Sequence, residues 1–173
     1  MIPKLKQFIE ENINLIENNR FFEVYNKINS YSFTRMFSEA MLGAGINPLL
    51  SLAEVPERFL YESTIRSVYI PEGVESIGRY AFADCKDLTN VELPVGLKII
   101  NEGAFMYCSN LESIILPSTL EVIDFGVFEG CNKLTNLYFR GTVDQWLKVR
   151  EKDDSLRASS HKIICSDGTF DFE

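Results

Sequence analysis

The apolar positions in the middle of the chain repeat every 23 residues. Three successive segments align without gaps: IPEGVESIGRYAFADCKDLTNVE from residue 70, LPVGLKIINEGAFMYCSNLESII from residue 93 and LPSTLEVIDFGVFEGCNKLTNLY from residue 116. Internal repetition of this kind is a stronger guide to fold than local propensity. Because one copy cannot cover its own apolar face, the pattern predicts a solenoid whose neighbouring coils stack into one continuous core.

Within the aligned copies, identical or similar side chains fall into the same columns. The columns are Pro71, Pro94 and Pro117; Ile77, Ile100 and Ile123; Phe82, Phe105 and Phe128; Cys85, Cys108 and Cys131; Leu88, Leu111 and Leu134; Val91, Ile114 and Leu137; and Ile70, Leu93, Leu116 and Phe139. We expect the members of each column to lie directly over one another, as layers of a shared core.

Each copy also contains a short stretch with the period of a β-strand. In LTNVEL, apolar and polar residues alternate, which is typical of a strand with one buried face. The prolines follow these strands, where a missing amide donor ends the pairing. Gly78, Asn101 and Asp124 precede the segments RYAFADC, EGAFMYC and FGVFEGC, and such residues favour the start of a helix or turn. The pattern predicts a parallel sheet on one face and short helices or turns on the other.

A weaker fourth copy precedes these three. Glu54 and Glu62 stand 23 residues before Ile77 and Cys85, in place of the isoleucine and the cysteine. We interpret this copy as a first coil adapted to the end of the stack. Its other members, which fall in register with the next copy, are Pro48, Phe59, Ile65, Val68 and Ile70.

Residues 1–47 carry apolar side chains at helical spacing. The dipeptide Asn18-Asn19 breaks the first pair of helices, Ser32 is placed to cap the third, and Gly43 is placed to end it. Because a solenoid exposes its core at both ends, we interpret this segment as an α-helical cap. A separate effector module is the alternative, and the two roles are compatible. The helical groups are Leu5, Phe8, Ile9, Ile13 and Ile16; Phe21, Val24, Tyr25 and Ile28; and Phe33, Met36, Phe37, Ala40 and Met41.

Residues 141–173 contain the signals of a carboxyl-terminal cap. Thr142 is a good N-cap for a helix through VDQWLKVRE, whose apolar side chains can lie on the stack. Lys162 to Cys165 then form one more expected strand, closed by a turn at Asp167-Gly168. We expect Trp146, the one tryptophan of the sequence, to fill the core rather than to anchor a partner.

The pattern IPxGVxxIGxxAFxxCxxLxxVxL, followed by the segment GTVDQW, closely resembles the BspA-like leucine-rich repeats of bacterial proteins. The resemblance covers residues 48 to about 170 and does not extend to residues 1–45. It implies an α/β leucine-rich-repeat solenoid over residues 48–140, used for protein binding and commonly found in surface or secreted adhesins.

The residues between the inward positions of each strand point to the open face of the sheet, which is the usual meeting surface of solenoids. Two tyrosines and an isoleucine there exceed what solubility requires, and aromatic residues are typical of binding hot spots. Two alternatives stay open: the amino-terminal helices fold over this face, or tyrosine simply favours strands. The predicted partner-binding residues are Tyr69, Glu92, Ile115 and Tyr138 in one row and Asn90, Ser113 and Asn136, preceded by Ser67, in the next; a third, less regular row is Arg66, Thr89, Glu112 and Thr135.

Composition and charge narrow the classes of partner. The chain is 46% apolar and 24% charged, as in globular proteins that bury a core. Its net charge is −8, and the acidic excess lies after residue 47. An acidic surface repels phosphate and attracts basic partners, so direct nucleic-acid binding is disfavoured. An acidic mimic of nucleic acid, blocking a basic groove, is a further hypothesis.

No arrangement of residues predicts catalysis, a metal site or a cofactor. Cys85, Cys108 and Cys131 recur once per coil, which suits small buried hydrophobes in a row better than a tetrahedral zinc site, and Cys165 is not placed to complete one. The single histidine, His161, has only Ser159 and Ser160 near it as candidate nucleophiles, and Asp153-Asp154 lies in a charged loop. No phosphate loop or dinucleotide fingerprint is present.

The sequence therefore predicts a non-catalytic protein-interaction module. We expect an intracellular bacterial or phage-encoded binder or inhibitor in the cytoplasm, because the amino terminus lacks the pattern of a secretory signal and no apolar run is long enough to span a membrane. A bacterial surface adhesin fragment is the alternative if a signal has been removed. The partner is an unidentified protein, and both a monomer and a homodimer remain open.

Overall fold

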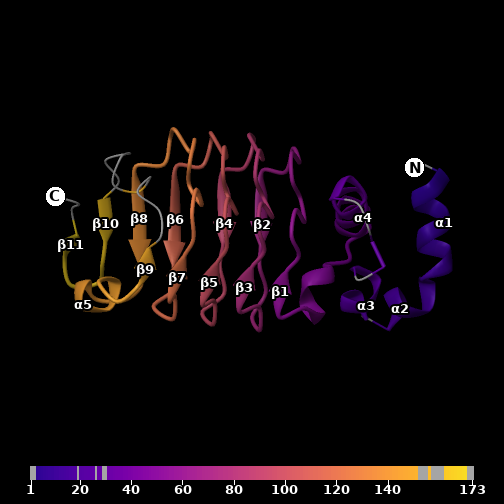
Figure 1. Cartoon of the computed structure of the whole chain (residues 1–173), viewed down its shortest axis with the longest axis horizontal. Coiled ribbons are helices and arrows are strands. Elements are labelled where there is room, and N and C mark those ends of the chain that lie inside the picture. Colours follow the sequence, from indigo (N-terminus) through magenta and orange to yellow (C-terminus); the bar gives the residue numbers. More distant parts are fainter. Residues whose placement is uncertain are drawn as a thin grey trace.

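The computed structural model is an elongated stack of coils with helices at its amino-terminal end (Figure 1). The structure describes residues 3–18, 20–25, 27–28, 31–151, 156 and 162–170. One hydrophobic core runs from Leu5 in the first helix to Cys165 near the other end. The stack is thus a solenoid, as the repeat predicts.

Each coil contributes two short strands, one to each side of the stack (Figure 1). The strands that follow the leucine column form the predicted parallel sheet, and the outer side of that sheet is called the open face below. The opposite side carries a second parallel sheet of two-residue strands, of which β1, β3, β5 and β7 are followed by turns rather than by a helix. The strands of the first side are β2 (Ser67–Tyr69), β4 (Asn90–Glu92), β6 (Ser113–Leu116), β8 (Asn136–Phe139) and β10 (Lys162–Ile164); those of the second are β1 (Glu54–Val55), β3 (Ser76–Ile77), β5 (Ile99–Ile100), β7 (Val122–Ile123) and β9 (Arg150–Glu151).

The phenylalanine column is stacked as expected. The rings of Phe82 and Phe105 lie 5.3 Å apart at 10°, and those of Phe105 and Phe128 lie 5.9 Å apart at 6°. Near-parallel rings one coil apart show that equivalent side chains lie over one another. The ring of Phe59 meets Phe82 edge-on instead, at 6.2 Å and 80°.

The cysteine column lies in the core, and its thiols also join the coils. The Sγ of Cys108 donates a hydrogen bond to the Phe82 carbonyl at 3.2 Å, and the Sγ of Cys131 donates to the Phe105 carbonyl at 3.1 Å. Cys85 donates in the same way to the Leu60 carbonyl at 3.0 Å. The cysteines therefore act as small core residues, as predicted, and also satisfy carbonyls of the preceding coil.

The first coil is one residue shorter than the others. Val55 pairs with Ile77 across an offset of 22 residues, whereas Val68 pairs with Val91 across 23. The expected placement of Glu54 in the isoleucine column is therefore wrong, because Val55 occupies it. The missing residue lies between β1 and β2. Strand β2 therefore pairs with β4 at the ordinary offset of 23 residues.

The same shift changes what stands in the cysteine column. Glu62 and Asp84 both adopt a left-handed backbone, with φ of 57° and 58°, and are structural counterparts. Buried Ser63, not Glu62, thus takes the place of Cys85. Phe59 likewise stands one residue ahead of the phenylalanine column, which accounts for its edge-on contact.

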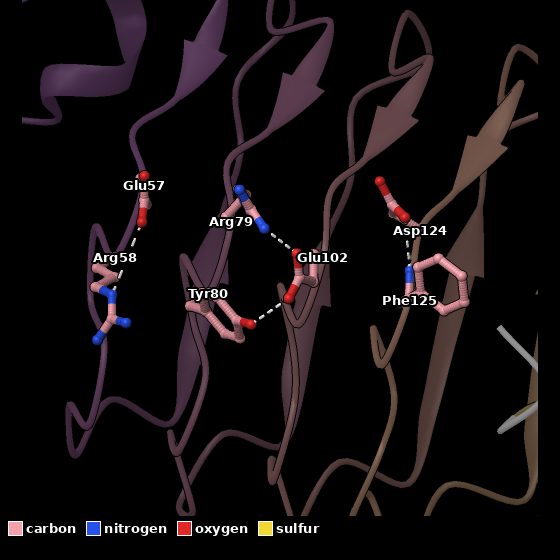
Figure 2. Close-up of polar contacts among 7 residues, drawn as sticks. All are labelled: Glu57, Arg58, Arg79, Tyr80, Glu102, Asp124 and Phe125. Carbon is pink, nitrogen blue, oxygen red and sulfur yellow. Dashed lines mark hydrogen bonds and ion pairs between the residues drawn. The ribbon is translucent and has the colours of Figure 1, made fainter. Parts of the chain in front are cut away.

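The turns that follow the two-residue strands form a second face, called the turn side below. On the turn side, tyrosine side chains extend from one coil to the next. Tyr80 has a φ of 54°, which directs its side chain along the stack, and its ring covers Gly103 of the following coil. Tyr107 covers Gly130 in the same way. Figure 2 shows Tyr80 and Arg79 both directed at Glu102, and their hydrogen bonds, that of Tyr80 foremost, lower the pKa of this carboxyl.

The first expected helix is broken at Asn12, whose side-chain amide donates to the Phe8 carbonyl at 2.9 Å. The last long helix ends at Gly43 as predicted, but it begins at Tyr31, so Ser32 is not its cap. Tyr25 contacts Phe59 at 6.1 Å between ring centroids, which places the helices on the first coil. The helices of this end are α1 (Pro3–Glu11), α2 (Ile13–Glu17), α3 (Phe21–Tyr25) and α4 (Tyr31–Gly43), followed by a 3-10 helix (Pro48–Ser51).

At the other end, Thr142 begins helix α5 (Val143–Trp146) with a capping box. The helix ends earlier than expected, since Arg150–Glu151 pairs with β7 as strand β9. Trp146 is buried against Phe139 at 5.3 Å, as predicted for a core residue. Strand β10 then pairs with β8, and β11 (Thr169–Phe170) turns back antiparallel to β10.

Candidate binding surface

The predicted outward rows lie on the open face. In β2 and β4 only the central residue is buried, and in β6 and β8 the buried positions alternate with outer ones. The amino-terminal helices lie at the end of the stack in Figure 1 and do not cover the tyrosine row. All seven predicted partner-binding residues are exposed or half-buried: Tyr69, Asn90, Glu92, Ser113, Ile115, Asn136 and Tyr138.

Apolar exposure is concentrated on this side of the molecule. Tyr69 is 55% exposed, Ile115 47% and Tyr138 40%. Val95, 53% exposed, follows β4 and lines the same surface. These four are among nine large apolar side chains of the described residues that reach such exposure, so the open face is the part of the stack best suited to apolar contact.

A groove of about 470 Å³ crosses the open face between β4 and β6. The two strands are neighbours, but the hydrogen-bonded ladder is interrupted between them, although the structure describes both in full. Five of the predicted residues line the groove, namely Tyr69, Asn90, Glu92, Ser113 and Ile115. Tyr138 and Asn136 belong to β8 and are not part of its lining.

The groove also includes residues that the sequence patterns did not indicate. Glu72 lines it, and its carboxylate accepts a hydrogen bond from the Val95 amide at 3.3 Å. Arg140 lines it from the fourth coil, where it occupies the place of the prolines. The Arg140 amide donates to the Leu116 carbonyl at 2.9 Å, a bond that proline cannot make. In the sequence, Arg140 stands out because it replaces proline at the position 23 residues after Pro117.

The buried thiols are poor nucleophiles. Burial raises the pKa of Cys85 and of Cys131 to about 12, and it raises the pKa of Cys108 as well. A thiol attacks or binds metal as the thiolate, so burial keeps this column unreactive. Across the described ranges, no group of three or more His, Cys, Asp or Glu residues is arranged to hold a metal ion.

Several residues weighed for chemistry lie outside the residues that the structure describes. They are His161, Ser159, Ser160 and the pair Asp153-Asp154. None of the helices found in the described ranges combines the length and the apolar character needed to cross a membrane.

The stacked columns and the parallel sheet with one open face define a leucine-rich repeat solenoid. Residues 53–148 match the family model described as "BspA type Leucine rich repeat region (6 copies)". The chain therefore belongs to the BspA-type leucine-rich repeat family. Solenoids of this kind are typically protein-interaction or surface modules.

Several solved structures of leucine-rich repeat proteins are similar to part of this chain. A leucine-rich repeat protein from T. pallidum is 31% identical, with a TM-score of 0.54 over 62% of this chain and 48% of that protein. A leucine-rich repeat protein from Bacteroides capillosus is 39% identical, with a TM-score of 0.48 over 51% of this chain and 63% of its own. A leucine rich cell surface protein from Faecalibacterium prausnitzii is 26% identical, with a TM-score of 0.41 over 57% and 32%.

This chain spans less than two thirds of each of these three proteins. A comparison with curated proteins finds no significant match.

Proposed function

We propose that this chain is a non-catalytic module that binds a protein through the open face of its solenoid. The observation that carries the proposal is the row of exposed apolar side chains on β2, β6 and β8, namely Tyr69, Ile115 and Tyr138. Aromatic residues presented on a rigid sheet lose little conformational freedom on binding, and they are enriched among hot-spot residues.

Charge on the open face favours a protein partner over a mimic of nucleic acid. Glu92 and Glu112 are exposed there, but so are Arg66, Arg140 and Lys162. A mimic of nucleic acid needs one uniform negative field, whereas mixed charges suit the polar rim of a protein interface. We therefore favour protein binding over the role of an acidic nucleic-acid mimic. A complex whose affinity falls steeply with increasing salt concentration would favour the mimic instead.

The finer roles are proposals about the biological setting. We propose an intracellular binder, with inhibition of its partner as the effect, and a surface adhesin as the alternative. The buried thiols serve either setting, because their raised pKa values keep them unreactive. Fractionation of the source cells, with an antibody against this chain, separates the two: the binder is found with cytoplasmic markers and the adhesin at the cell surface.

Affinity capture tests the open face directly. The folded chain is immobilised, exposed to a lysate of the source cells, and its bound proteins are identified by mass spectrometry. The variant Tyr69→Ala/Tyr138→Ala should lose the specific partner, because two apolar anchors are removed from the surface.

The matched control is Phe125→Ala/Leu147→Ala. Phe125 lies on the turn side (Figure 2) and Leu147 beside α5, and they are 59% and 61% exposed. This variant removes as much exposed apolar surface from elsewhere and should keep the partner. Circular dichroism confirms that both variants fold. Retention of the same partner by the tyrosine variant would refute the proposal.

A further inference from the structure

We propose that the groove between β4 and β6 binds an extended peptide segment of the partner that carries a basic and an acidic side chain about three to four residues apart. The basic side chain lies at Glu72 and Glu92, and the acidic one at Arg140. This inference rests on the proposed function, because it names the chemistry of the segment that the open face recognises.

Two of the three charged side chains of the groove, Glu92 and Arg140, lack side-chain partners within the described ranges: neither forms an ion pair or a side-chain hydrogen bond, and both are exposed. Glu72 accepts one amide and keeps its negative charge facing the groove. Because both carboxylates come from the first two coils and the guanidinium from the fourth, the groove has a negative and a positive end. A partner with the opposite order of charges is favoured, and a like-charged one is repelled.

The parallel sheet is not continuous along the groove. The Glu92 carbonyl accepts from the Ile70 amide and so points toward β2. The N–H and C=O of the preceding residue, Val91, point the other way, toward β6, because successive residues of a strand alternate. Val91 is 6% exposed, and no strand pairing joins β4 to β6 within the described ranges. A peptide that runs from Glu92 toward Arg140 crosses the strands on the open face, so it contacts the side chains of the groove rather than these main-chain groups.

The spacing of the charges follows from the repeat. Glu92 belongs to the second coil and Arg140 to the fourth, and Arg140 stands two residues further along its strand direction. Two coil steps of about 4.8 Å and two residues of about 3.3 Å, at right angles, therefore separate them by roughly 12 Å. An extended chain advances about 3.3 Å per residue, so roughly three to four residues cover this span. Tyr69 and Ile115 flank the groove and can pack against the aliphatic stem of a lysine or arginine.

Selection from a phage-displayed library of random peptides tests the inference. The probe is a library of peptides about 12 residues long, which exceeds the roughly three- to four-residue span of the groove, selected against the whole folded chain. We expect the selected peptides to carry one basic residue, Lys or Arg, and one acidic residue, Asp or Glu. The two should stand two to four positions apart, close to the roughly three- to four-residue spacing derived above. A winning peptide, labelled with fluorescein, then gives dissociation constants by fluorescence polarisation. Glu92→Gln and Arg140→Gln should each weaken its binding about two- to five-fold, as expected for partly exposed ion pairs.

Matched controls separate the groove from general charge effects. Glu112→Gln and Lys133→Gln remove one exposed acid and one exposed base that do not line the groove, and they should leave the affinity unchanged. Glu92→Lys should abolish binding of the winning peptide. The same variant should bind a second peptide, in which glutamate replaces the basic residue. Such rescue requires direct contact between the two charges.

The outcomes distinguish this inference from the proposed function. Winning peptides without paired charges, still lost in the Tyr69→Ala/Tyr138→Ala variant, would overturn the inference and leave open-face binding intact. Equal weakening by groove and control variants, or no enrichment at all, would overturn the inference too. In those cases the affinity capture still decides the proposed function, because it uses the partner itself rather than a peptide.

Discussion

At the residue scale, neighbouring coils are joined by single side chains that point along the stack. Tyr80 extends from a left-handed backbone onto Gly103, and Arg58, at the equivalent place in the first coil, lies over the Tyr80 ring at 5.2 Å. Because Tyr80 itself tolerates the left-handed conformation, glycine is needed at position 103 chiefly to make room for the ring. A glycine in one coil thus depends on a tyrosine in the coil before it.

Gly103→Ala tests this dependence. A Cβ at Gly103 would overlap the Tyr80 ring, which Glu102 holds by a hydrogen bond. We expect the free energy of unfolding to fall by about 1–3 kcal/mol in urea denaturation. Gly96→Ala is the control, because a Cβ there meets no atom within 4 Å and the backbone is not left-handed. Equal stability of the two variants would contradict the dependence.

Residue identities predicted the columns well but not their exceptions. The stacked phenylalanines and the buried cysteines follow from the 23-residue period alone, and the burial of Trp146 follows from the apolar pattern of the expected carboxyl-terminal helix. The period failed in the first coil, where a one-residue deletion moves Val55 and Ser63 into columns that a constant offset assigns to glutamates. The groove could not be predicted from the sequence, because its lining combines residues of the first, second, third and fourth coils and depends on how their strands are arranged in space.

At the scale of elements, tertiary pairing overrides local propensity at both ends of the stack. VDQWLKVRE has the pattern of one helix, yet Arg150–Glu151 pairs with β7, because an extra strand extends the second sheet. In the first expected helix, the Asn12 side chain bonds the Phe8 carbonyl and so competes with helical hydrogen bonding. Local patterns predict the existence of these helices more reliably than their ends, since ends depend on contacts distant in the chain.

Helix α5 depends on its capping box. The Thr142 hydroxyl accepts from the Gln145 amide at 3.2 Å, and the Gln145 side chain accepts from the Thr142 amide at 2.9 Å. Thr142→Ala should lower the free energy of unfolding by about 1 kcal/mol in urea denaturation, because an N-cap bond is lost. Thr64→Ala, at an exposed threonine of the first coil, should change it little. An unchanged midpoint for Thr142→Ala would show that α5 is held by the packing of Trp146 instead.

At the scale of the whole molecule, stability should fall in alkaline solution. The unfolded thiols ionise above their ordinary pKa of 9.0, while burial holds Cys85 and Cys131 protonated up to about pH 12. The folded state therefore binds more protons between these values, and its stability decreases as pH rises through them. Each thiol contributes a slope of about 1.4 kcal/mol per pH unit.

Comparison of the chain with Cys85→Ala isolates this effect. Tyr80 and Tyr107 also have raised pKa values, so they weaken the fold in the same pH range, but they are present in both proteins. The variant should be less stable at neutral pH, where a buried side chain is truncated, and should lose stability less steeply above about pH 9. Urea denaturation at a series of pH values measures both slopes, and parallel curves would contradict the prediction.

The hydrogen bonds of the cysteine column all run in one direction, from a thiol to a carbonyl of the preceding coil, and this bears on how the solenoid can change in length. Each cysteine donates to the coil before it, while its own coil offers the same carbonyl to the next. Loss or duplication of one 23-residue unit therefore leaves every remaining donor with an acceptor. Recombination within the gene can therefore shorten or lengthen the solenoid by whole repeats, and each such event adds or removes one strand of the proposed binding surface.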